Sequence, residues 1–275
     1  MIENPYESPE TSENLIVEQN NNSPLLPTPR MTKFFASTAW TEQAFRLFAD
    51  NFWLWVGGVL LVILVSNAAG MVIPLLGSIV NAILSPILFA GISYAAHKSF
   101  NNESIEIGDF FSGFKIRGGA LAAVGGVSLL GWTIITIICL AVYLSAATAI
   151  GALDLNNIFE EDFLFQLFTN TNMLYPLLLG VLFALLFALP LIAALFYAPT
   201  LLILHPELDF GQSLLLSFKG VFKNFFSFIP YSVIIMVVFF LGLLFFIVGV
   251  FVAIPLISLT IYTSYREIFL TDPEF

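Results

Sequence analysis

The feature that most constrains this chain is a set of four long stretches that contain no charged residue and no histidine. They cover residues 51–96, 118–153, 172–204 and 224–265. A helix needs about 20 consecutive apolar residues to cross the hydrocarbon core of a bilayer. The first and last stretches are each long enough for two such helices, and 59% of all residues are hydrophobic against 10% charged. The sequence therefore predicts an all-α, polytopic membrane helix bundle.

The stretch 118–153 has 36 residues, and its length fits either one long span or two short ones. Charge can decide between them, because cytosolic loops carry an excess of Lys and Arg. With one span, all nine Lys and Arg residues fall on one side of the membrane, and the acidic segment 154–173 falls on the other. We therefore predict six transmembrane helices, with both termini in the cytosol, in a bacterial inner (cytoplasmic) membrane. The predicted spans are about 52–73, 76–97, 120–150, 174–204, 227–248 and 250–268.

The first part of the chain differs in composition from the spans. Residues 1–32 are rich in Asn, Glu, Ser and Pro and lack apolar periodicity, which predicts a disordered cytosolic tail. This acidic, polar start also gives no reason to expect a secretory signal peptide. A six-span membrane domain is expected over 33–270, followed by a short cytosolic tail at 271–275. The formal net charge of −10 does not favour a nucleic-acid partner.

One amphipathic segment occurs twice, as "AFRLFADNFWLW" at 44–55 and as "SFKGVFKNFFSF" at 217–228. In both copies apolar residues recur at i, i+3, i+4 and i+7, the spacing of one helix face. Asp209 and Gln212 form a capping box where the second helix is expected to begin. The predicted apolar stripes are Phe45, Phe48, Ala49 and Phe52 in the first copy, and Phe218, Val221, Phe222 and Phe225 in the second.

Basic residues accompany these stripes and suggest a role for the two segments. Arg46, Lys219 and Lys223 are the candidate contacts to lipid headgroups, and each cation near an anionic surface contributes about 1 kcal/mol. In this interpretation each helix lies in the cytosolic interface, with its aromatic side toward lipid. The alternative is that the stripes pack on neighbouring spans, and the sequence leaves both open.

The likeness between the two segments extends into the spans that follow. The second span of each pair ends alike, in "PILFAGISYAAHKSF" at 86–100 and in "PLISLTIYTSYREIF" at 255–269. Both units start on the cytosolic side, so the internal repeat is expected to be parallel. A third, shorter interfacial segment is expected at "GDFFSGFK", 108–115, with Asp109 capping its helix.

The uncharged stretches contain no ionisable residue that would mark a site within the membrane. Asn67, Asn81 and His205 are the candidate polar site residues in or beside the spans. The asparagines could coordinate a neutral solute or simply bond between helices. His205, beside Glu207, could serve a metal or a proton, or cap the end of a helix. We predict no catalytic residue, no cofactor and no metal ligand.

The stretch "YAPTLLILHPELDFGQSLLLSFKGVFKNFFSF", followed by two spans and "YREIF", resembles bacterial multi-pass inner-membrane proteins of the YciC-like group. It is similar, more distantly, to the membrane domain attached to some glycerophosphoryl diester phosphodiesterases. The likeness covers roughly 36–269, and "GDFFSGF" looks like this group's loop after the second span. The resemblance implies a membrane module that brings no known catalytic residues.

These observations favour an integral membrane protein that is not an enzyme and acts as a lipid-interacting or membrane-assembly component. Its expected partners are membrane lipids, together with a membrane-protein partner or further copies of the chain. The alternative is a transporter or channel for a neutral or lipidic solute, which would use the proline-broken spans and Asn67 or Asn81.

Overall fold

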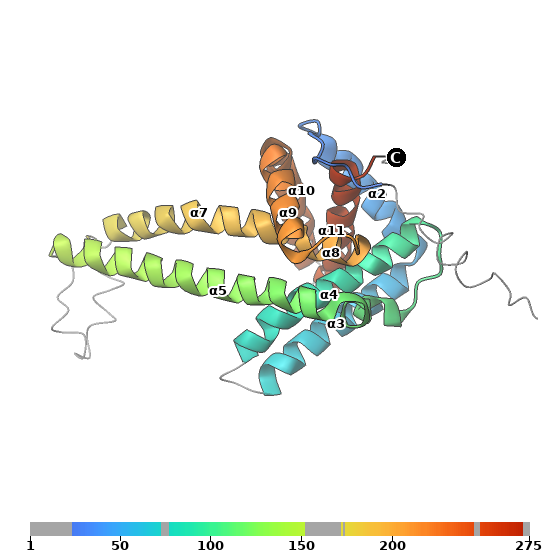
Figure 1. Cartoon of the computed structure of the whole chain (residues 1–275), viewed down its shortest axis with the longest axis horizontal. Coiled ribbons are helices and arrows are strands. Elements are labelled where there is room, and N and C mark those ends of the chain that lie inside the picture. Colours follow the sequence, from blue (N-terminus) through green and yellow to red (C-terminus); the bar gives the residue numbers. More distant parts are fainter. Residues whose placement is uncertain (1–23, 73–76, 152–171, 173, 245–247, 272–275) are drawn as a thin grey trace, which may run out of the picture.

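The computed structural model describes residues 24–72, 77–151, 172, 174–244 and 248–271, and its secondary structure is helical (Figure 1). Helices dominate because the long apolar segments can satisfy their backbone groups internally only in this way. The elements are α2 (Ala36–Asp50), α3 (Phe52–Val72), α4 (Gly77–Phe100), η1 (Ile107–Phe111), α5 (Ser112–Ala149), α7 (Leu174–Phe196), α8 (Ala198–Leu204), α9 (Phe210–Lys223), α10 (Phe225–Leu244) and α11 (Val248–Phe269).

Five helical segments in the described part are each long and apolar enough to cross a membrane. They contain α4, α5, α7 with α8, α10 and α11. The described part of α3 supplies a sixth when it is joined to α2, from which it is bent by 98°. The predicted fold class, an all-α polytopic membrane helix bundle, is therefore confirmed.

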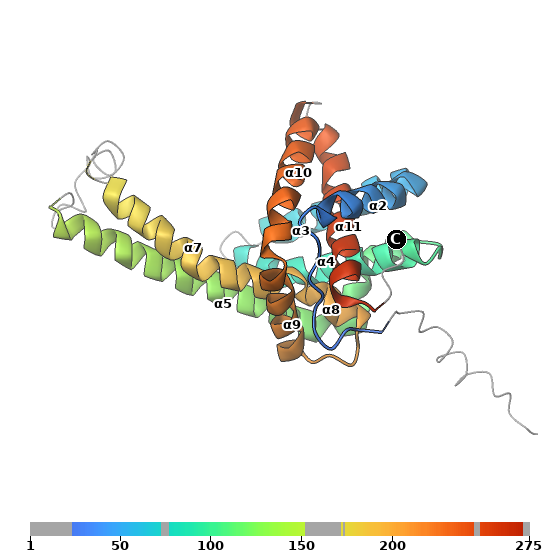
Figure 2. The same cartoon turned by 90° about the horizontal axis from the view of Figure 1, so that it is seen from above.

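The spans form three hairpins that point away from a common centre (Figures 1 and 2). The hairpin of α5 and α7 extends away from the rest of the molecule in both views. Only 6% and 11% of the most apolar window of these two spans is buried, against 44% in α4 and 50% in α11. The protein core therefore lies around α4 and α11, while α5 and α7 turn most of their surface outward.

Two spans differ in detail from the prediction. The third begins at Ser112 instead of about 120, and its backbone is kinked at Arg117, where φ is −143° and ψ is 37°. The fourth is divided at Tyr197, since Pro199 occupies the first turn of α8 and cannot continue the hydrogen bonding of α7. Sequence hydropathy detects neither break, because both lie next to apolar residues.

Residues 24–33 form a strap across the end of α11, so the prediction of disorder as far as residue 32 is wrong for 24–32. The N–H of Leu26 donates to the carbonyl of Phe269 at 2.8 Å, and the N–H of Arg30 donates to the carbonyl of Ile268 at 2.7 Å. A helix end leaves its last carbonyls without partners, and the strap supplies them. Residues 1–23, the loop 154–171 and residues 272–275 lie outside the described part.

Asn224 fastens the strap to the break between α9 and α10. Its side-chain oxygen accepts from the N–H of Thr32 at 2.7 Å and from the Thr32 hydroxyl at 2.9 Å. Its amide group donates to the carbonyls of Arg30 and Gly220, each at 2.9 Å. Asn51 occupies the equivalent break between α2 and α3, but its side chain is exposed.

The two predicted repeat units have the same order of described elements: amphipathic helix, break at an asparagine, span, span. The capping box at Asp209 and Gln212 is confirmed, with the Gln212 N–H donating to Asp209 Oδ1 at 2.7 Å. The packing differs, however, since α2 lies against α11 and α10, whereas α9 lies against α7 and α8. The parallel repeat thus stays a prediction.

Replacing Asn224 by alanine should lower the free energy of unfolding by about 1–3 kcal/mol, because buried partners on the strap lose their hydrogen bonds. The measurement is equilibrium unfolding in detergent micelles, together with protease sensitivity of residues 24–33, which should increase. Asn51→Ala is the matched control and should change stability by less than about 0.5 kcal/mol. Equal effects of the two substitutions would contradict the role of Asn224.

Candidate functional site

The last turns of α11 form a buried polar centre, here called the α11 hub and defined as residues 262–267. Thr263 Oγ1 donates to the carbonyl of Trp40 at 2.9 Å, and the Trp40 indole N–H donates to the Glu267 carboxylate. Trp40 is fully buried. These two contacts hold α2 against α11 and explain why Trp40 sets the inward face of α2.

The hub also binds the end of α4. The His97 Nδ1 and the Tyr262 hydroxyl share a hydrogen bond of 3.0 Å. The Arg266 guanidinium carbon lies 3.5 Å from the centre of the Phe100 ring, and Arg266 is only 5% exposed. An aromatic face stabilises a desolvated cation of this kind. A buried arginine is therefore accommodated in the hub by a ring and a tyrosine hydroxyl.

The third contact of the hub is with the segment around α8. The Tyr197 hydroxyl bonds to Ser264 Oγ at 2.7 Å, at the break between α7 and α8. His205 follows α8, and its Nε2 bonds to the Tyr265 hydroxyl while its Nδ1 lies 3.1 Å from Glu207. His205 therefore joins the α8 end to α11, and its ring bonds to these side chains instead of capping helix carbonyls.

Burial lowers the pKa of His205 below its ordinary value of 6.5, and the neighbouring carboxylate of Glu207 partly opposes this shift. In the neutral tautomer that carries its proton on Nδ1, the imidazole donates a hydrogen bond to Glu207 and accepts one at Nε2 from the Tyr265 hydroxyl. Arg117 fixes the backbone of the same loop by donating to the carbonyls of Leu208 at 2.7 Å and Pro206 at 3.2 Å. No three metal-ligating side chains converge among the described residues.

The other two predicted polar residues lie far from His205. Asn81 accepts a hydrogen bond of 2.5 Å from the Ser66 hydroxyl, which links α4 to α3. Asn67 donates to the carbonyl of Ile63 in its own helix at 2.7 Å. Asn81 is near the start of α4, roughly 24 Å along the helix from His97, which bonds to Tyr262 of the hub. The structure therefore does not bring Asn67, Asn81 and His205 into one site, and it favours the helix-bonding interpretation of Asn81.

The inward face of α9 is built from small and polar residues, not from its phenylalanines. Ser217 Oγ accepts from the N–H of Tyr197 at 2.9 Å and donates to the carbonyl of Ala193 at 2.7 Å. Gly220 approaches the ring of Phe269 so closely that an added Cβ would lie 2.4 Å from it. Glycine is needed here because no other side chain fits between the two helices.

The predicted aromatic stripe of α9 faces outward only in part. Phe222 is 46% exposed and Phe225, at the start of α10, is 47% exposed. Phe218 and Val221 are half-buried, and Val221 packs against the core. The structure therefore favours the lipid-facing alternative for Phe222 and Phe225 and packing on neighbouring helices for Val221. The stripe predicted for α2 is wrong in part, since Phe45 is 59% exposed while Phe48 is buried. Because Trp40 binds to α11, the buried face of α2 differs from the predicted one.

The three predicted headgroup contacts differ in their surroundings. Arg46 forms an exposed ion pair with Glu42 at 2.6 Å. Lys223 Nζ donates to the carbonyl of Pro29 in the strap at 2.7 Å. Lys219 is exposed and makes no hydrogen bond or ion pair with any described residue. Asp109 is not itself the N-cap that the sequence predicted. Glu106 is the N-cap of η1, and Asp109, at the third position, accepts from the Glu106 N–H and pairs with Lys98 at 2.9 Å.

An apolar groove of about 260 Å³ lies between α7, α9 and α10. Its lining is almost wholly apolar and includes the exposed rings of Phe222 and Phe225. The lining residues are Leu189, Ile192, Ala193, Phe196, Val221, Phe222, Phe225, Phe228 and Ser232. Lys219 precedes the lining residues Val221 and Phe222 on the same helix, and a groove with this lining suits a chain of methylene groups.

Sequence reasoning did not identify Trp40, Tyr197, Tyr265 and Arg266 as members of one centre. Tyr265 and Arg266 lie in the polar ending "SYREIF" of the last span, which was interpreted as an exit into the cytosol. The available signal was the mismatch between that polar ending and the apolar helix before it. Such a mismatch does not say which other helix supplies the partners.

The stability of the folded protein should fall as the pH decreases below about 6.5, where the His205 imidazole of the unfolded chain binds protons that the buried ring resists. The groups that face His205 are Glu207, Tyr265, Arg117 and, further off, His97 and Arg266. His205→Gln should flatten the dependence of unfolding on pH between about 5 and 7. Glu207→Gln removes the opposing carboxylate and should steepen it, and an unchanged profile in both variants would refute this role.

No protein-family model matches the chain, and comparison with curated proteins and with solved structures finds no match either. The function is therefore inferred from the geometry and chemistry of the described residues.

Proposed function

We propose that this protein is a non-enzymatic, lipid-interacting component of a bacterial inner membrane, and that α9 is its contact with anionic lipids of the cytosolic leaflet. The observation that carries the proposal is the outward face of α9. Lys219 stands there without a hydrogen-bond or ion-pair partner among the described residues, one turn before the exposed ring of Phe222. An amphipathic helix with aromatic and basic residues on its outer faces is suited to the boundary between headgroups and acyl chains.

The packing of α9 supports this orientation. On its inward face Ser217 bonds to α7 and Gly220 packs against Phe269 of α11, while Asn224 at the end of α9 bonds to the strap. The phenylalanines are therefore free to enter the acyl-chain region, and the lysine is free to contact a phosphate. A cation at an anionic membrane surface contributes about 1 kcal/mol, which is enough to bias lipid composition around the helix.

The groove beside α9 adds a place for the acyl chain of the same lipid. From Phe225 to Ser232 its α10 wall spans eight residues, or roughly 10 Å along the helix. Ser232 already bonds to the carbonyl of Phe228 in its own helix and offers no free polar group. The groove thus holds a chain by apolar contact, and Lys219 selects the headgroup.

The two amphipathic helices have different shares in this function. In α2 the cation Arg46 is paired with Glu42, and the inward face is fixed to the hub by Trp40. We infer that α2 serves mainly to brace α11, while α9 contacts lipid. This division departs from the equal roles that the repeated sequence suggested.

The alternative of a transporter or channel gains no support from the asparagines on which it rested, because Asn67 and Asn81 bond to α3 and not into a shared cavity. The likeness to the YciC-like group remains a prediction, as do a membrane-protein partner and self-association. The mostly exposed hairpin of α5 and α7 is the part of the described structure with the most surface for such a partner.

Lys219→Gln should reduce the enrichment of anionic lipid around the protein, because it removes the unpaired cation of α9 without changing buried contacts. The protein is reconstituted in nanodiscs with equal phosphatidylglycerol and phosphatidylcholine, extracted, and its retained lipids are counted by native mass spectrometry. The expected loss is about fivefold in the preference for phosphatidylglycerol, corresponding to roughly 1 kcal/mol. Arg46→Gln, at a cation that is already paired with Glu42, is the matched control, and equal losses would contradict the proposal.

The orientation of the chain can be tested separately. Reporter fusions at Gly113 and at Gln212 should be found in the cytosol, and a fusion at Asn157 outside, because all Lys and Arg residues then lie on the inner side. Compartment-specific reporters, such as alkaline phosphatase and a fluorescent protein, give the readout. The reversed pattern would place α9 in the outer leaflet and overturn its cytosolic role.

A further inference from the structure

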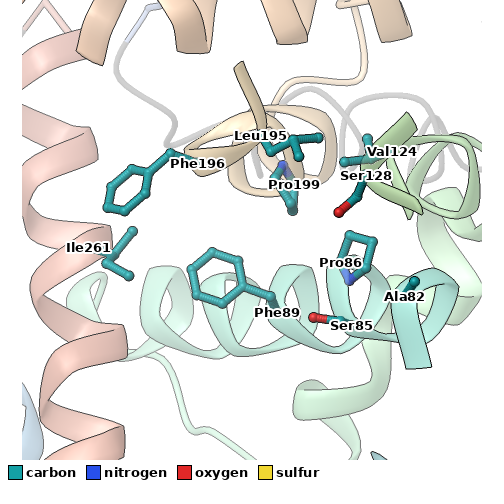
Figure 3. Close-up of a pocket in the computed structure, with 10 residues that line it drawn as sticks. All are labelled: Ala82, Ser85, Pro86, Phe89, Val124, Ser128, Leu195, Phe196, Pro199 and Ile261. Carbon is teal, nitrogen blue, oxygen red and sulfur yellow. The ribbon is translucent and has the colours of Figure 1, made fainter. Parts of the chain in front are cut away.

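A second cavity, of about 290 Å³, lies where α4, α5, α7, α8 and α11 meet (Figure 3). Apolar side chains form most of its wall, among them Phe89 from α4, Phe196 from α7 and Ile261 from α11. None of its lining residues carries a charge. It is separate from the groove beside α9, although Phe196 contributes to both.

Two hydroxyl groups line this cavity without a hydrogen bond to any described residue. They belong to Ser85 of α4 and Ser128 of α5, and the Ser128 hydroxyl points into the cavity (Figure 3). Other hydroxyls in the spans behave differently: Thr136 and Ser145 each donate to the carbonyl one turn earlier in their own helix, at 2.8 and 2.6 Å. In the hydrocarbon core no water replaces a missing hydrogen-bond partner, so these two hydroxyls need a partner from another molecule.

Two prolines line the same cavity and leave further polar groups there. Pro86 and Pro199 have no N–H, so the carbonyl four residues earlier loses its usual helical donor. These carbonyls belong to Ala82 and Leu195, and both residues are themselves part of the wall. The residues of the wall thus carry two hydroxyls, which donate or accept, and two carbonyls whose usual helical donor is missing.

We propose that this cavity binds a lipid alcohol, a neutral molecule with a free hydroxyl on an apolar body. Its hydroxyl would donate to a proline-freed carbonyl and accept from a serine, while its chain would lie against the aromatic wall. A charged ligand is disfavoured, because no lining residue could neutralise it in this environment. The site lies well inside the membrane, since Ser128 is roughly 16 Å along α5 from Arg117. Ser85 is exposed at the surface of the bundle, so the ligand can enter from the bilayer.

The probe is a diacylglycerol with a photoactivatable diazirine in one acyl chain, added to the full-length protein in nanodiscs. Labelled peptides, identified by mass spectrometry, should come from α4 around Ser85 and α5 around Ser128. The same probe with its hydroxyl acetylated should lose this labelling on the unmodified protein. Ser85→Ala and Ser128→Ala should each reduce labelling about fivefold, as expected for one hydrogen bond.

Ser145→Ala is the matched control, because Ser145 lies on the same helix and bonds to its own backbone outside the cavity. Its labelling should equal that of the unmodified protein. Labelling spread evenly over the exposed faces of α5, α7 and α10, or equal labelling by the acetylated probe, would overturn the proposal. These outcomes are independent of the test at Lys219, since the probe carries no charge and the cavity has no cation.

Discussion

The fold depends on the last turns of α11, where six consecutive side chains bind three neighbouring parts of the protein. Tyr262 and Arg266 hold α4, Thr263 and Glu267 hold α2, and Ser264 and Tyr265 hold the segment around α8. Helices in a bilayer gain little from apolar contact with one another, because lipid chains are equally apolar. A buried set of directed hydrogen bonds can therefore fix the arrangement of helices that apolar surface alone would leave undetermined.

The number and approximate extent of the spans could be predicted because the bilayer imposes a length that the sequence shows directly. Helix ends with local causes were also predictable, as at Asp209, where the cap is formed by a residue three positions away. The α11 hub was not predictable, because its residues are separated in sequence from their partners by 60 to 227 positions, and periodicity carries no information about contacts at such separations. The strap could not be predicted for the same reason. Residues 24–32 have the composition of a disordered segment, and they are ordered by hydrogen bonds to carbonyls that α11 leaves free.

The amphipathic stripes show that a sequence can predict a helix correctly and still mislead about which face of the helix is buried. Both segments are helices, as predicted, yet their phenylalanines do not set the inward face. In α9 that face belongs to Ser217 and Gly220, whose small size permits close approach to α7 and α11. An amphipathic pattern identifies the buried face of a helix only when the surrounding solvent is water. Next to a bilayer the apolar side has a second favourable environment, and close packing of small residues decides between the two.

The position of the hub near the end of the chain has a consequence for biosynthesis. The ribosome synthesises α4, α7 and α8 before residues 262–267. The first hairpins must therefore enter the membrane without the hydrogen bonds to the hub that later join them. Until translation is nearly complete, Trp40, His97 and His205 remain without their final partners. A chain that ends prematurely would carry intact spans with unsatisfied polar side chains, the kind of surface by which membrane proteases and chaperones distinguish unfinished proteins from finished ones.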